Sequence, residues 1–291
     1  MKKKLFLGMT VGAAVLVAAC GDTAEVKKDD SSSGKTTDKS ELTLQQVYDK
    51  TLDRQQELKS SKVDMNMDMD IEMTVDGETV NMTSNSALTM ETVISPLQFF
   101  IDGTTSMTDD STGEELEVPM KMYMTEKDGF YLYEETAGGW LKLPNEEFEG
   151  MLEAAGMQND ATEQLKQLQQ FIKEFKFEQT DDSFVLTLDA EGEKFLEFIK
   201  EEASAALGEE GEALFADLSS LTFDNAKYEL TIDKKTFDLT NMVVDMVMNI
   251  NEEGIETKIT QSATINYYDF NSIDSITVPQ DVIDTAEEFT Y

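Results

Sequence analysis

Histidine is absent from this 291-residue chain, so the side chain that most often serves as a general base or a metal ligand is missing. The Gly-x-Ser-x-Gly elbow, the Walker loop, the Rossmann glycine pattern and the cysteine spacing of zinc sites are missing as well. The chain has 60 Asp and Glu residues, but no two of them stand out as an acid–base pair. We therefore expect a protein that is not an enzyme and that uses no cofactor and no metal.

Methionine is the residue type with the unusual distribution. Of 17 methionines, 13 fall on segments that the sequence predicts to be strands. Strand interiors ordinarily use Val, Ile and aromatic residues, whereas the flexible, polarisable Met suits surfaces that accept apolar shapes of many kinds. A sheet surface lined in this way could hold an acyl chain or another hydrophobic small molecule. The candidates to line such a cavity are Met65, Met67, Met69, Met120, Met122, Met124, Met242, Met246 and Met248.

Other interpretations of the same residues stay open. Helices that cover the sheet would turn the methionines into ordinary core residues, with Met filling the gaps. The rows Met65-x-Met67-x-Met69 and Met120-x-Met122-x-Met124 would present several thioethers to Cu(I), but a copper site needs converging and accessible ligands. The alternating acidic residues Asp64, Asp68, Asp70 and Glu72 are typical of a solvated strand face, and the loop pattern of EF-type calcium sites is missing.

A period of two in hydrophobicity predicts the strands. Val63 to Val75 alternate strictly between apolar and polar side chains, and Asp76-Gly77 is a hairpin signal. Further strands are predicted over 80–90, 97–107, 116–126, 129–135, 140–143, 174–180, 183–189, 221–233, 237–250 and 255–268. Strands joined by turn-length connections pair antiparallel, because parallel strands need long crossovers.

A helical period predicts the remaining elements. Thr43 and Gln46 fit a capping box that opens a helix over 44–60. Apolar residues at helical spacing predict further helices over 148–155, 165–175, 191–207 and 211–218, a second capping pair at Asp160 and Glu163, and a terminal helical turn over 281–288. The fold class is α+β, with one large antiparallel sheet plus helices, since the helices come between two runs of strands and do not alternate with them.

The first twenty residues predict the location of the protein. Lys2, Lys3 and Lys4 precede an apolar run over 5–17, which is typical of a secretory signal peptide and too short to span a membrane. The sequence Val17-Ala18-Ala19-Cys20 resembles the lipobox of bacterial lipoproteins, and Cys20 is the only cysteine. The resemblance implies cleavage before Cys20, a diacylglyceryl group on its thiol, and a lipid anchor at the extracytoplasmic face of the cell membrane.

The segment after Cys20 has almost no apolar side chain and predicts a disordered tether. We expect residues 1–19 to form the signal peptide, 20–41 a tether with a span of roughly 25 Å, and 42–291 a single domain. Loss of Lys2, Lys3 and Lys4 with the signal peptide changes the formal charge from −37 to −40. A chain this acidic repels nucleic acid and anionic headgroups, so it would be held at a membrane by acyl chains and not by a basic surface.

Several stretches together resemble an uncharacterised family of Gram-positive surface lipoproteins. They are SSKVDMNMDMDIEM, FYLYEETAGGWLKL and YELTIDKKTFDLTNMVVDM. Through that family the chain is similar to LolA, LppX and LprG, which implies a curved antiparallel sheet, an open half-barrel, with helices on its concave face and a cavity for acyl chains. The leading expectation is an anchored, non-catalytic lipoprotein that binds a lipid or another hydrophobic ligand in a methionine-lined cavity. The alternative is an envelope protein-interaction or sensing module with a filled core, for which the sequence names no protein partner.

Overall fold

A computed structural model of the chain describes residues 23–27, 39–109, 112–135, 138–144, 161–190, 196, 221–252 and 254–289. The signal peptide and Cys20 lie outside these residues. So do Asp160 of the second capping pair and the helices expected over 148–155, 191–207 (apart from residue 196) and 211–218.

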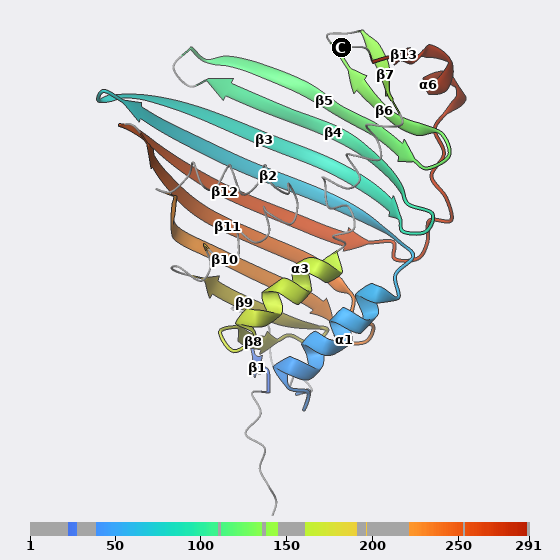
Figure 1. Cartoon of the computed structure of the whole chain (residues 1–291). Coiled ribbons are helices and arrows are strands. Elements are labelled where there is room, and N and C mark those ends of the chain that lie inside the picture. The colour runs from blue at the N-terminus through green and yellow to red at the C-terminus, as the bar shows by residue number, and fades with distance from the viewer. Residues whose placement is uncertain are drawn as a thin grey trace, which may run out of the picture.

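One thirteen-stranded sheet dominates the structure (Figure 1). Its strands are β1 (Glu25–Val26), β2 (Ser60–Val75), β3 (Glu78–Val93), β4 (Gln98–Asp109), β5 (Glu114–Thr125), β6 (Gly129–Glu134), β7 (Gly139–Leu143), β8 (Lys176–Gln179), β9 (Ser183–Ala190), β10 (Thr222–Asp233), β11 (Leu239–Glu252), β12 (Ile255–Tyr268) and β13 (Glu287–Glu288). The spatial order is β1-β8-β9-β10-β11-β12-β2-β3-β4-β5-β6-β7-β13. The prediction of one large, mostly antiparallel sheet is confirmed.

Local sequence signals explain most of this order. Each strand predicted from alternation is present, with its ends shifted by a few residues. Asp76 and Gly77 both have positive φ, 52° and 85°, as a tight hairpin turn with two left-handed residues requires. This turn joins β2 to β3 and keeps these two successive strands side by side.

A pairing between distant segments closes the two runs of strands into one sheet. Strands β2 to β7 form one meander and β8 to β12 form another, and β12 pairs antiparallel with β2 from Ile255–Val75 to Tyr268–Lys62. Every residue from 255 to 268 has a partner in β2. This register is maintained over the whole length of β12 because it places the apolar positions of both strands on the same face of the sheet.

Short parallel strands from near the two chain ends cover the edges of the sheet. β1 pairs with β8, and β13 pairs with β7. Covered edges of this kind limit pairing with other chains. Within the tether expected over 20–41, residues 23–27 are ordered against the sheet, and Ala24 is fully buried.

Gln179 holds this N-terminal segment in place. Its buried amide donates to the carbonyl of Ala24 at 3.0 Å and accepts from the backbone N–H of Ser40 at 3.0 Å. One side chain thus bonds to the backbone on both sides of residues 28–38. Composition alone could not reveal this, since the partner lies 139 or more residues away.

Replacing Gln179 with Ala is expected to release the N-terminal segment from the sheet. The substitution leaves the Ala24 carbonyl buried without its donor, a cost of about 1–3 kcal/mol. Hydrogen exchange should show faster exchange of the amides of Lys27 and Ser40, while the exposed substitution Gln56→Ala leaves both unchanged. Unchanged exchange in Gln179→Ala would show that backbone pairing alone holds β1.

The helices pack on both faces of the sheet. α1 (Leu44–Gln56) begins at Thr43, where the predicted capping box is present. α3 (Ala161–Leu168) continues into the 3-10 helix η1 (Gln169–Phe171). α1 and α3 lie against the β8–β12 half of the sheet, whereas α6 (Gln280–Thr285) lies at the β7 end (Figure 1).

Candidate functional site: the methionine face

The register of the sheet places all 13 strand methionines on one face. Directly opposite residues on antiparallel neighbours point to the same side, and Met65 is opposite both Ile265 and Leu88, while Ile265 is opposite Met242. The same alternation continues through β4 and β5 to Met124. We call this side the methionine face; its methionines are Met65, Met67, Met69, Met73, Met82, Met90, Met107, Met120, Met122, Met124, Met242, Met246 and Met248.

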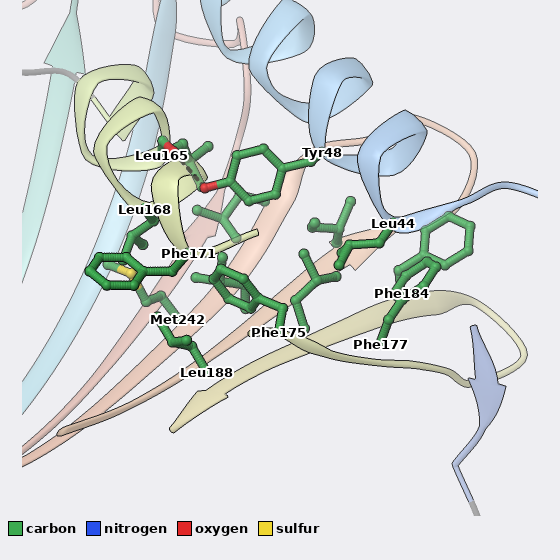
Figure 2. Close-up of a cluster of buried hydrophobic side chains, with 14 of the residues drawn as sticks. Leu44, Tyr48, Leu165, Leu168, Phe171, Phe175, Phe177, Phe184, Leu188 and Met242 are labelled. Atoms are coloured by element: carbon green, nitrogen blue, oxygen red, sulfur yellow. Dashed lines mark hydrogen bonds between the residues drawn. The ribbon is translucent and has the colours of Figure 1, made fainter. Parts of the chain in front are cut away.

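Helices α1 and α3 cover one end of the methionine face. Met242 is 7% exposed and lies in the main core with Leu168 and Phe171 (Figure 2), and Met67 and Met246 pack against the same cluster. The Tyr48 hydroxyl of α1 donates to the carbonyl of Leu165 in α3 (Figure 2), and burial raises the pKa of this phenol. At this end, therefore, methionine serves as a core residue.

A second group of methionines lies toward the β7 end of the same face. Met124 is 3% exposed and forms a small core with Phe130. Met122 packs against that core, and its strand neighbours Ile101 and Leu132 are also apolar. Met120 lies opposite Gly103 on β4.

Small side chains separate the two methionine groups. Ser84 and Ser86 of β3 lie opposite Met69 and Met67, and Thr105 lies beside them on β4. The Ser86 and Thr105 hydroxyls are hydrogen-bonded at 2.9 Å. With Gly103 they form a band of small residues across the middle of the methionine face. This band was not among the predicted site residues, although the run of small residues from Thr83 to Ala87 is a signal for it.

The nine candidate methionines are therefore on one face but in two groups. Met65, Met67, Met69, Met242, Met246 and Met248 lie on β2 and β11, whereas Met120, Met122 and Met124 lie on β5, beyond β3 and β4. Of the nine, Met124 and Met242 are buried, and the other seven are partly exposed.

A tyrosine adds a polar group to the methionine face. Tyr267 of β12 lies opposite Val63 of β2 and packs against the main core. Burial raises the pKa of Tyr267 above the ordinary value, at which a phenol is already neutral at physiological pH. It is a group that can donate a hydrogen bond beside apolar side chains.

The opposite face of the sheet is polar and acidic. The Asp64 carboxylate accepts from Thr89 at 2.8 Å, and Asp245 accepts from Ser262 at 2.7 Å. A pocket of about 170 Å³ on this face is lined by Lys227, Glu229, Val243 and Asp245. Over the described ranges, no three His, Cys, Asp or Glu side chains are grouped to hold a metal ion.

The tyrosine-rich end of the polar face carries α6. Val282 of α6 and Val278 pack on Tyr131, with Tyr123 and Trp140 at the edge of this cluster. Tyr131 points away from the methionine face because it alternates with Phe130 and Leu132 along β6. α6 therefore does not cover the methionine face.

Fold and site together define a protein built on one large, open and mostly antiparallel sheet with an apolar and an acidic face. Residues 43–287 match the model of DUF6612, a family of unknown function, and the chain belongs to this family. The expectation of an uncharacterised family is confirmed. A search of the curated proteins found no match.

Two solved structures are similar over much of their length. One is a DUF1329 family protein from Desulfovibrio piger, with 8% identity, covering 80% of this chain and 95% of the other, at a TM-score of 0.19. The other is a β-barrel-like protein of the domain of unknown function DUF1849 from Brucella abortus, with 9% identity, covering 71% and 98%, at a TM-score of 0.18. TM-scores this low do not establish a common function.

Proposed function

We propose that this protein is a membrane-anchored, extracytoplasmic lipoprotein that binds a lipid or another hydrophobic molecule on its methionine face, without catalysis. The single observation that carries the proposal is the collection of 13 strand methionines on one side of the sheet, with seven of the nine candidates partly exposed. Flexible thioether side chains can follow the shape of an acyl chain at low strain.

In this proposal the ligand lies between the two methionine groups. The band of Ser84, Ser86, Gly103 and Thr105 offers less bulk than the methionines on either side. The sheet then works as an open half-barrel of the LolA, LppX and LprG kind, with α1 and α3 on its concave face. Tyr267 supplies a neutral hydroxyl to a polar end of the ligand.

The anchor in this proposal is a diacylglyceryl group on Cys20. Two acyl chains hold a protein stably at a membrane, whereas one gives marginal attachment. No helix among the described residues is long and apolar enough to cross a bilayer. Thr23 already bridges to Thr43, so the three residues from Cys20 to Thr23 give a reach of only about 10 Å. The β1–β8 edge is therefore held near the membrane surface.

Binding of a fluorescent fatty acid tests the ligand proposal. Met65→Gln/Met69→Gln keeps side-chain length but adds two amides, and we expect it to weaken binding by about tenfold, since each buried CH₂ contributes about 0.8 kcal/mol. The control Asn66→Gln lies on the polar face of the same strand and should bind like the parent chain. A parent chain that binds no acyl probe would refute the proposal.

The anchor has its own test. Intact mass measurement of the membrane-extracted protein should show the diacylglyceryl group on a chain that begins at Cys20, and Cys20→Ser should appear in the soluble fraction without it. An unmodified Cys20 would remove the anchor but leave ligand binding to be judged by the fatty-acid experiment.

One observation favours a second candidate function, an envelope interaction or sensing module with a filled core. Met242 is buried beneath α3 and η1, so part of the methionine face is already filled by the protein's own side chains. This candidate predicts a purified protein that carries no lipid and a protein partner recovered by crosslinking in intact cells.

A further inference from the structure

Six large apolar side chains are exposed together at one end of the sheet. They are 37–61% exposed: Val75, Val80, Met82, Met107, Leu116 and Ile255. We call them the distal patch. All lie near the turns at Gly77, Gly113 and Gly254, which join β2 to β3, β4 to β5 and β11 to β12. These three turns lie on the left side of Figure 1. None is among the nine candidate methionines, and α1 and α3 lie at the opposite part of the sheet.

The strand register makes the distal patch continuous. Val75 lies opposite Ile255, and Met107 lies opposite Leu116. Val80 and Met82 follow on β3, opposite Met73 and Ile71 of β2. All six side chains point to the methionine face, so they form one surface across five strands. Monomeric proteins rarely leave such a surface exposed unless it contacts something.

Carboxylates lie beside the distal patch and along the strands that carry it. Glu78 lies opposite Val75 on the same face, and Glu114 lies two residues before Leu116 on that face. Lys258 is the only basic residue in the segments 70–83, 105–118 and 250–262, which also hold acidic residues at 70, 72, 76, 78, 109, 110, 114, 115, 117, 252, 253 and 256. The field around the patch is therefore strongly negative.

This charge selects the kind of partner. A second copy of the chain carries the same −37 formal charge and the same acidic rim, so self-association is opposed. An anionic bilayer is repelled for the same reason. A cationic surface is attracted, and an apolar stripe on it would cover the exposed side chains.

We propose that the distal patch docks a cationic amphipathic helix of a partner protein. The apolar stripe of that helix covers Met107, Leu116 and their neighbours, while its Lys and Arg side chains meet Glu78 and Glu114. This mode of recognition places an amphipathic helix on an apolar surface, with charge setting the choice of partner. It is independent of acyl binding, because different residues carry it.

Titration calorimetry with the chain from Cys20 onward and a model Leu/Lys amphipathic helix of about 18 residues tests the apolar contribution. Met107→Ser/Leu116→Ser leaves the charge unchanged, and we expect it to weaken binding by about tenfold or more. The matched control is Val26→Ser/Ile94→Ser, which changes the two large exposed apolar residues outside the patch among the described residues and should bind like the parent. Equal affinity of all three chains would overturn the proposal.

A second pair of variants tests the position of the charge. The variant Glu78→Gln/Glu114→Gln removes two negative charges beside the patch. The variant Glu25→Gln/Glu57→Gln removes two negative charges from exposed sites away from it. We expect the first to weaken peptide binding several-fold and the second to have little effect. Equal weakening by both would show attraction by net charge alone and overturn the proposal.

Two further measurements test whether a bilayer or a second copy of the chain binds the distal patch instead. Sedimentation of the chain with vesicles of anionic lipid that depends on Met107 and Leu116 would assign the patch to a bilayer. A concentration-dependent dimer that Met107→Ser/Leu116→Ser abolishes would assign it to a second copy. Either result would overturn the proposal, and neither bears on fatty-acid binding by Met65 and Met69.

Discussion

Leu230→Ala is expected to lower the free energy of unfolding by about 2–5 kcal/mol. Leu230 is 0% exposed and lies on β10 between Leu186 of β9 and Met242 of β11, on the face covered by α1 and α3. The substitution removes buried methyl and methylene groups, and the neighbouring strands cannot move inward because their backbones are paired on both sides.

Urea unfolding followed by far-UV circular dichroism checks this prediction. Leu116→Ala is the matched control, since Leu116 is 61% exposed and the same atoms are lost; we expect a change within about 0.5 kcal/mol. Similar midpoints for both variants would contradict the assignment of Leu230 to the core. A Leu230→Met variant, which nearly conserves volume, should lose less than about 1.5 kcal/mol.

Gly103→Ala is the second large effect, with an expected loss of about 3 kcal/mol. A Cβ at Gly103 would lie 2.1 Å from the carbonyl oxygen of Ala87 and 2.8 Å from the Cα of Leu88. These atoms belong to the backbone of β3, so relief requires separation of β3 from β4 and cannot come from a change of side-chain rotamer. Glycine is therefore needed here because two backbones approach closely.

The control for this substitution is Gly139→Ala. Gly139 of β7 has no atom within 4 Å of the position of an added Cβ, and Ala there should be neutral or slightly stabilising, by up to about 1 kcal/mol. Thermal unfolding compares the two variants with the parent. If Gly103→Ala unfolds at the parent temperature, the close approach of β3 and β4 is not present in solution.

Gly103 also connects stability with the proposed binding surface. It belongs to the band of small residues between the two methionine groups. A shift of β3 from β4 would change the distance between Met69 and Met120. We therefore expect Gly103→Ala to change fatty-acid binding as well as to lower stability, whereas Leu230→Ala should mainly lower stability.

Much of the local structure could be predicted from the sequence. Strict alternation from Val63 to Val75 identified β2, and the Asp76-Gly77 pair identified its turn, because both depend on neighbouring residues alone. The capping box at Thr43 identified the start of α1 for the same reason. The sequence also predicted that the methionines of each strand lie on one side of that strand, since side chains alternate with a period of two.

Only the tertiary structure decided how these pieces combine. The pairing of β12 with β2 joins residues more than 170 positions apart. Gln179 donates a hydrogen bond to Ala24, in a segment whose composition predicts disorder. The same pairing placed the methionines of β2 and β11 together, whereas those of β5 lie beyond β3 and β4. The physical reason is that a period or a turn is set by adjacent residues, whereas strand partners and the face that a helix covers depend on which distant apolar surfaces bury each other best.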